Sequence, residues 1–248
     1  EQSFHLGDSI KQDDAETPYK NIVAKGRHAA TLHHVDYDRA RDAAPSLLVD
    51  AGATCNGYHS DITRTWVRGE GAAARGFRDL VRRVEALQQE MCRRAVPGVL
   101  YEDLHDETHR LLAPALRELG LARGSDAELV ARGVTRKFFP HGLGHSLGVQ
   151  THDVGCRVRE PRPDNVYLRT TVTLAVDHVF TVEPGCYFID SLLDELRASL
   201  AGELVNWNEV EALKPFGGVR IEDNVVVGEK GPRNLTREGF AAAARATV

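Results

Sequence analysis

Apolar residues recur at helical spacing in the middle of the chain and mark its longest predicted helix. Between Phe77 and Met91 they fall three or four positions apart, and Pro97-Gly98 ends the pattern. A second helix is predicted over residues 102–119 and a last one over residues 237–246. The segment 138–148 is too rich in glycine to form a regular helix.

Short apolar or alternating runs predict strands on both sides of the two long helices. Asn56-Gly57 lies between two such runs and predicts a hairpin turn. Because strands and helices mix without a regular β-α-β alternation, we expect an α+β fold. The order of strands, helices and strands recurs in part after residue 136, which suggests two related halves. The predicted strands cover residues 21–24, 29–33, 47–49, 62–67, 172–182 and 219–227.

Length, charge and cysteine content disfavour several classes of protein. The length of 248 residues suits one large domain, so we expect a single domain over residues 1–248. There are 36 acidic residues against 31 lysines and arginines, a net charge of −5 that does not favour nucleic-acid binding. No run of 18 apolar residues predicts a membrane span. The four cysteines form no CxxC pair, which is typical of reduced thiols in a cytoplasmic protein.

Two aspartates flank the predicted hairpin turn. With a two-residue turn, Gly52 lies opposite Asp61, and Asp50 points to the same face of the sheet as Gly52. The two carboxylates then become diagonal neighbours, about 7–8 Å apart at the backbone. Two like charges so placed repel unless a cation lies between them. Two solvated surface aspartates are the alternative interpretation.

Further acidic and imidazole groups follow in the second half of the chain. Glu183 ends an apolar run and precedes Pro184-Gly185, whereas Glu222 shares one face of an extended segment with Arg220. His141 and His145 are four residues apart in the glycine-rich segment and would lie on one side of it. If the two aspartates and two glutamates converge, their four negative charges balance two divalent cations. One histidine among carboxylates favours Mn²⁺, with Co²⁺ or Zn²⁺ as alternatives.

These residues, in this order, resemble the pita-bread metallopeptidases. The resemblance covers the chain from about Pro18 to the C-terminus and is nearest to the bacterial Xaa-Pro dipeptidases, or prolidases, a group that includes organophosphorus acid anhydrolases. It implies a curved sheet with helices outside and an internal pseudo-two-fold. The matching segments are Asp50-x-Gly52, Gly57-Tyr58-x-x-Asp61, His141-Gly-Leu-Gly-His145, Glu183-Pro184-Gly185 and Arg220-Ile-Glu222-Asp223.

The resemblance also assigns roles to individual residues. It implies that two metal ions are held by Asp50, Asp61, His145, Glu183 and Glu222, with Asp61 and Glu222 bridging them. Glu183 would act as general base, His152 would stabilise the oxyanion, His141 would shape the proline pocket, and Arg220 would hold the carboxylate of the dipeptide. The side-chain pockets would be built by Tyr19, Leu32, His33 and Thr151. His105 and His109 are spaced like a helical metal pair, but no glutamate completes an HExxH motif, so we assign them no metal.

The expected function is metal-dependent hydrolysis of Xaa-Pro dipeptides with release of proline. Prolidases carry a sizeable N-terminal domain before the matching region, and in that family it contributes to the homodimer and closes the pocket. We therefore expect this chain to be either a fragment of a longer enzyme or a shortened protein with an open site. Thr151 stands where Ile or Val is usual, and His34 stands where Tyr is common. The alternatives are aminopeptidase cleavage of longer peptides, phosphotriester hydrolysis at the same centre, and a non-catalytic binding module.

Overall fold

The first half of the chain builds an antiparallel sheet with the strand order β1-β2-β5. The computed structural model describes residues 12, 16–36 and 43–246. The strands are β1 (Ile22–Lys25), β2 (Ser46–Ala51) and β5 (Ile62–Val67), and β3 (Thr54–Cys55) pairs with β4 (Tyr58–His59) in a hairpin. Asn56 and Gly57 both have positive φ, 51° and 82°, which confirms the predicted turn.

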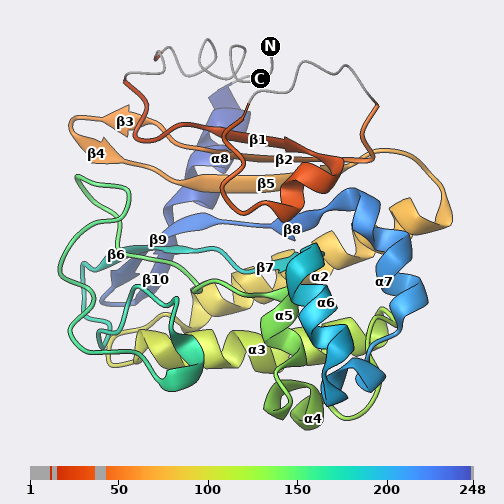
Figure 1. Ribbon diagram of the computed structural model, residues 1–248. Helices are drawn as coiled ribbons and strands as arrows, with labels where there is room; N and C mark the ends of the chain where they lie inside the picture. The colour runs from red at the N-terminus through yellow and green to blue at the C-terminus, as the bar shows by residue number, and fades with distance from the viewer. Residues whose placement is uncertain (1–11, 13–15, 37–42, 247–248) are drawn as a thin grey trace.

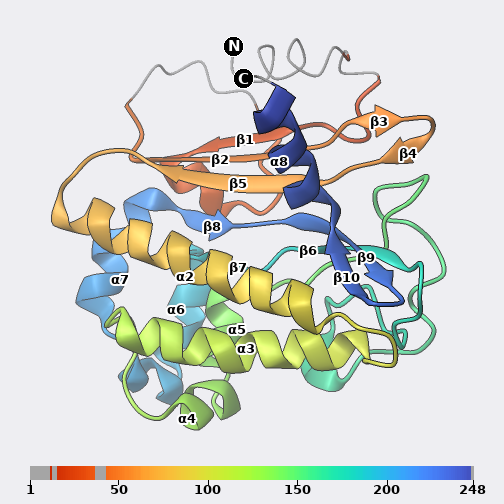
Figure 2. The same ribbon diagram turned by 180° about the vertical axis from the view of Figure 1, so that it is seen from behind.

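The second half builds a matching three-stranded sheet, β10-β9-β6, and a separate pair, β7-β8, all antiparallel. One three-stranded sheet from each half agrees with the expectation of two related halves. Figures 1 and 2 show these strands as one curved layer above the long helices. The strands are β6 (Val179–Val182), β7 (Gly185–Tyr187), β8 (Gly218–Arg220), β9 (Asp223–Gly228) and β10 (Gly231–Asn234).

Helices cover one side of this layer. In both views α2 and α3 lie side by side beneath the sheets, while α8 lies behind β5 in Figure 1 and in front of it in Figure 2. The apolar stripe from Phe77 to Met91 is buried along α2, as its spacing predicts, and α3 continues through Pro114. The helices are α2 (Ala72–Arg94), α3 (Tyr101–Glu118), α4 (Asp126–Ala131), α5 (Val134–Phe138), α6 (Asp190–Ala198), α7 (Trp207–Leu213) and α8 (Leu235–Ala246).

Three predicted strands differ from the structure. Residues 29–33 are not a strand, because a 3₁₀ helix (Gly26–Ala30) begins at Gly26, whose φ is +52°. Of the run 172–182, only residues 179–182 form a strand, which is β6. The run 219–227 is two strands, since the chain leaves β7 at Ile221 and then joins β6. Within the described residues, no helix is long and apolar enough to cross a membrane.

Candidate metal centre

Asp50 and Asp61 lie as neighbours, as the hairpin register predicts. Ala51 pairs with Ile62 and Cys55 with Tyr58, so one register runs from the sheet into the hairpin. A Cβ at Gly52 would lie 2.0 Å from the carbonyl oxygen of Ser60, so only glycine fits between the aspartates. Both aspartates are buried, which excludes the interpretation as solvated surface groups.

The Tyr19 hydroxyl lies between the two aspartates. It is 2.7 Å from Asp50 Oδ1 and 2.6 Å from Asp61 Oδ1. A phenol carries one hydrogen and can donate it to only one carboxylate. The hydroxyl therefore offsets the charge of only one aspartate at a time, and further partners are Arg220 for Asp50 and His145 for Asp61. Two buried carboxylates held this close together are suitable ligands for metal ions.

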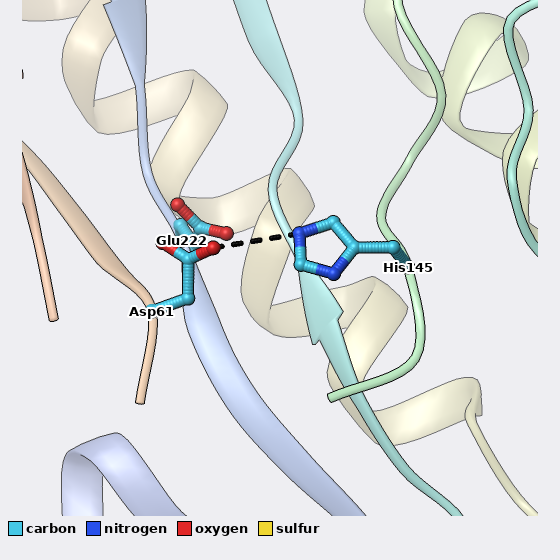
Figure 3. A group of neighbouring side chains, drawn as sticks. All are labelled: Asp61, His145 and Glu222. Atoms are coloured by element: carbon cyan, nitrogen blue, oxygen red, sulfur yellow. Dashed lines mark ion pairs between the residues drawn. The ribbon is translucent and has the colours of Figure 1, made fainter. Parts of the chain in front are cut away.

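Asp61, His145 and Glu222 form the centre of the cluster (Figure 3). Each offers one ligand atom, and these atoms lie within 4.8 Å of one another. His145 Nε2 is 3.4 Å from Asp61 Oδ2, the ion pair that is dashed in Figure 3. The three residues come from three separate segments of the chain, and each is at most 6% exposed. The spacing and burial suit a bound cation.

Glu183 and Asp50 complete the set of five at its two sides. Glu183 Oε1 is 3.5 Å from His145 Nε2, and Asp50 connects to Asp61 through Tyr19. The structure thus brings all five predicted ligands into one cluster.

Close backbone contact places His145 in the cluster. A Cβ at Gly144 would lie 2.2 Å from the carbonyl oxygen of Thr181, so the glycine-rich segment can lie directly against β6. There the Thr181 N–H donates to the carbonyl of His145 at 2.9 Å, and Thr181 Oγ1 accepts from the His145 N–H at 3.1 Å. These bonds fix the backbone from which the His145 imidazole extends.

The electrostatics of the cluster call for positive charge. Burial, together with the neighbouring carboxylates, raises the pKa of Glu222 well above its usual range. Burial also raises the pKa of Glu183 to about 7 and that of Asp50 above its usual value, although Arg220 acts against both shifts. Burial by itself would raise the pKa of Asp61 and lower that of His145. The hydrogen bond between the two side chains acts against burial, and the pKa of Asp61 is lowered while that of His145 is raised. Oxygen-rich donors with one imidazole and unbalanced negative charge suit divalent metal ions.

Arg220 connects the cluster to a second layer of residues. Its guanidinium donates to Asp50 Oδ2 at 2.5 Å, to Thr63 Oγ1 at 3.2 Å and to the Tyr187 hydroxyl at 3.2 Å. Thr63 donates in turn to Glu222 Oε2 at 2.6 Å, and Tyr187 lies 2.8 Å from His141 Nε2.

Sequence reasoning missed both Thr63 and Tyr187. Thr63 had a detectable signal, because it lies two positions after Asp61 in an alternating strand and so faces the same side. Tyr187 comes from β7, and nothing in its sequence context points to His141.

The predicted substrate residues differ in how directly they contact the cluster. The His152 ring contacts the His145 ring edge to face, with 4.3 Å between centroids. Burial lowers the pKa of His33, and the charges of Arg220 and Arg169 lower it further. Thr151 Oγ1 lies 3.1 Å from His59 Nδ1. Leu32 is half-buried, and no described contact connects it to the carboxylates.

Arg169 is a cation near the site that the sequence analysis missed. It is exposed, and its charge lowers the pKa values of both His33 and His152. Among the described residues, no hydrogen bond or ion pair occupies its guanidinium. Arg169 thus lies near His33 and His152 with its charge unpaired by any described residue.

Comparisons with known proteins show which proteins the chain is similar to. The chain is 48% identical over 242 residues to an Xaa-Pro dipeptidase of Aeromonas hydrophila, a match that covers 93% of this chain and 54% of that protein. It is 42% identical to the Xaa-Pro dipeptidase of Stenotrophomonas maltophilia, covering 98% of this chain and 56% of the relative. The chain therefore spans about half the length of the curated relatives it matches.

Solved structures confirm the pita-bread fold. Aminopeptidase P from Escherichia coli with the inhibitor Pro-Leu matches with a TM-score of 0.71 and 29% identity, covering 94% of this chain and 48% of that one. Proline aminopeptidase P II from Yersinia pestis matches with a TM-score of 0.72 and 28% identity, covering 94% and 49%. The family model of metallopeptidase family M24 matches residues 3–229. Since the match spans most of this chain, the chain belongs to metallopeptidase family M24.

Proposed function

We propose that this chain hydrolyses Xaa-Pro dipeptides and releases proline. The convergence of five candidate metal ligands from distant segments, four of them buried and Glu183 nearly so, carries the proposal. Relatives named Xaa-Pro dipeptidase, 42–48% identical over most of this chain, support the choice of substrate. We further propose that residues 1–248 act as one catalytic domain in the cytoplasm and that the protein forms a homodimer.

We propose two divalent ions for the cluster, with Mn²⁺ as the first choice and Co²⁺ or Zn²⁺ as alternatives. Asp61 and Glu222 would bridge the two ions, and Asp50, His145 and Glu183 would complete their coordination. Bound there, the ions supply a water of lowered pKa and polarise the substrate carbonyl.

Glu183 would act as the general base. It is almost buried and borders the cluster, with its Oε1 3.5 Å from His145 Nε2. A carboxylate positioned beside an attacking water can take its proton. His152, whose ring contacts that of His145, would donate toward the carbonyl oxygen of the substrate as negative charge develops there.

His141 is held neutral and in one tautomer, which suits a residue that shapes the proline pocket. Burial lowers its pKa to about 3. Its Nδ1 lies 2.8 Å from the carbonyl oxygen of Gly142, which can only accept, so Nδ1 carries the hydrogen. Nε2 then accepts from the Tyr187 hydroxyl. His141 accordingly presents an uncharged ring to the substrate.

We propose two arginines, Arg220 and Arg169, for binding the carboxylate of the dipeptide. Arg220, which was expected in that role, donates once each from Nε, Nη1 and Nη2 to protein partners, and this leaves two of its five N–H groups for a ligand. Arg169 is exposed near His33 and His152, and its guanidinium has no hydrogen-bond or ion-pair partner among the described residues. An exposed guanidinium can form the bidentate pair that a carboxylate favours. Arg220 would also orient Asp50 and Tyr187.

The variant Glu183→Gln tests the general base. We expect a loss in kcat of about 100-fold or more on Ala-Pro, because a positioned base contributes on that order. The metal content of the purified variant is measured in parallel. Glu195→Gln is the control, since Glu195 pairs with Lys137 on the surface and should leave kcat unchanged. Near-wild-type hydrolysis by Glu183→Gln with metal bound would refute the assignment.

Aminopeptidase activity is the second candidate, because the matching solved structures are aminopeptidases P. Comparing the hydrolysis of Ala-Pro with that of Ala-Pro-Ala discriminates the two. Preference for the dipeptide supports the dipeptidase, and equal or faster cleavage of the tripeptide supports the aminopeptidase.

A further inference from the structure

A short loop over residues 148–152 carries two residues of the proposed substrate site and has few contacts. Val149, Gln150 and His152 are exposed, and the one hydrogen bond within the loop runs from the N–H of Gly148 to the carbonyl of Gln150 at 3.1 Å. The flanking residues are paired, since the Asp153 N–H donates to the carbonyl of Ser146 at 3.1 Å. The loop itself therefore depends on contacts from elsewhere for a defined shape.

His59 of the β3–β4 hairpin supplies those contacts. Its N–H donates to the carbonyl of Gly148 at 2.8 Å, and its Nδ1 lies 3.1 Å from Thr151 Oγ1. Within the described parts of the chain, these are the hydrogen bonds that connect residues 148–152 to another segment. Figures 1 and 2 both place the hairpin next to the green loop that follows α5. One side chain thus joins the hairpin before Asp61 to the loop that carries His152.

We infer that His59 is a positioning residue that determines substrate specificity through Thr151. A hydrogen bond to Thr151 Oγ1 selects one rotamer of a β-branched side chain, and the backbone bond fixes the loop next to it. Together they give the wall beside His152 a single shape. The side chain of the Xaa residue is the part of the substrate that this wall would select. The inference rests on the proposed dipeptidase function.

Three variants and one double variant test the role of His59. His59→Ala and Thr151→Val each remove the same hydrogen bond, and valine keeps the shape of threonine. His59→Asn is the matched control, because an asparagine amide places a hydrogen-bonding atom close to the position of Nδ1. The quantity measured is the ratio of kcat/KM for Leu-Pro to that for Ala-Pro.

We expect the ratio to change about two- to tenfold in His59→Ala and in Thr151→Val, the range for one net hydrogen bond. The double variant should change it no further, and His59→Asn should stay within about twofold of wild type. General destabilisation would lower both kcat/KM values together and leave the ratio unmoved. An unchanged ratio in both single variants, or additive effects in the double variant, overturns the inference.

Hydrogen exchange of the amides of residues 148–152 tests the anchor without relying on activity. In the metal-free chain we expect faster exchange in His59→Ala and Thr151→Val but not in His59→Asn. If the wild-type chain hydrolyses no Xaa-Pro dipeptide, the proposed function is wrong, and so is the role of His59 in specificity. The exchange measurement still tests whether His59 anchors the loop. If His59→Ala does not fold, Thr151→Val alone decides both measurements. Unchanged exchange in Thr151→Val would overturn the anchor.

Discussion

The Tyr19 hydroxyl shares one hydrogen between two buried aspartates, and this makes its contribution dependent on metal. In the metal-free chain the hydroxyl lies 2.7 Å from Asp50 and 2.6 Å from Asp61 and partly offsets their repulsion. Bound cations would offset the same repulsion more strongly. The side chain should therefore matter more to the empty site than to the loaded one.

The variant Tyr19→Phe tests this dependence. We expect the free energy of unfolding of the metal-free chain to fall by about 1.5–3 kcal/mol, the range for a hydrogen bond to a charged acceptor. With saturating Mn²⁺ the loss should be clearly smaller. Urea denaturation with and without chelator gives both values. A loss of equal size in the two states would contradict this view of Tyr19.

At this scale the sequence predicted which five candidate ligands lie together, but not the residues that support them. Asp50 and Asp61 follow from a two-residue turn and strand alternation, which are local rules. Tyr187 meets Arg220, 33 positions away, where β7 pairs with β8, and it meets His141 across 46 positions. Such pairings depend on tertiary structure, and local patterns do not encode them.

At the scale of elements, helix α8 stabilises the strand next to Glu222, one of the candidate metal ligands. Asp223 begins β9 directly after Glu222 and is fully buried. It accepts from Arg64 Nη2 at 2.6 Å, from Asn234 Nδ2 at 2.7 Å and from Arg237 Nε of α8 at 2.9 Å. Arg237 also pairs with Glu85 of α2 at 2.7 Å. The start of α8 thus connects β9 to α2.

Removing the guanidinium of Arg237 should weaken this connection. We expect Arg237→Ala to lower the free energy of unfolding by about 1–3 kcal/mol, because a buried carboxylate loses one of its charged partners. Metal affinity should also fall, since Glu222 adjoins Asp223. Arg233→Ala is the control, since the exposed Arg233–Glu238 pair should contribute less than about 1 kcal/mol. Equal effects of the two variants on stability would refute the special role of Arg237.

The elements themselves were predictable where their pattern was long. The helix α2 follows from about four turns of apolar spacing between Phe77 and Met91, whereas the strand expected over 29–33 is a 3₁₀ helix and a turn. A Cβ at Gly217 would lie 2.2 Å from the carbonyl oxygen of Gly26, so distant backbone packs tightly against this turn. A segment of five residues is too short for its apolar and polar positions to reveal such packing.

At the scale of the whole molecule, two buried histidines of α3 connect stability to pH. Burial lowers the pKa of His105 to about 4 and that of His109 to about 2. Arg136 Nη1 lies 3.3 Å from His109 Nε2, so that nitrogen accepts and the ring is neutral. Unfolding would return both histidines to an ordinary pKa near about 6.5.

The unfolded chain therefore binds protons below about pH 6.5 while the native histidines stay neutral. The free energy of unfolding should fall as the pH drops from 6.5 toward 4, by up to about 1.4 kcal/mol per pH unit for each histidine. The double variant His105→Asn/His109→Gln should show a shallower slope, whatever its stability at pH 7.5. Urea denaturation between pH 7.5 and 4.5 measures both slopes. Parallel slopes would show that the two histidines are not the cause.

The ligands of the candidate metal centre divide between the two ends of the chain. Asp50 and Asp61 precede the long helices, whereas His145, Glu183 and Glu222 follow them, and Thr63 reaches Glu222 across 159 positions. A chain cut between α3 and α4 would leave each fragment with an incomplete coordination set. Tight metal binding would then require both fragments to associate correctly. Metal uptake could thus serve as a reporter of fragment complementation, and of the last long-range step when the intact chain folds.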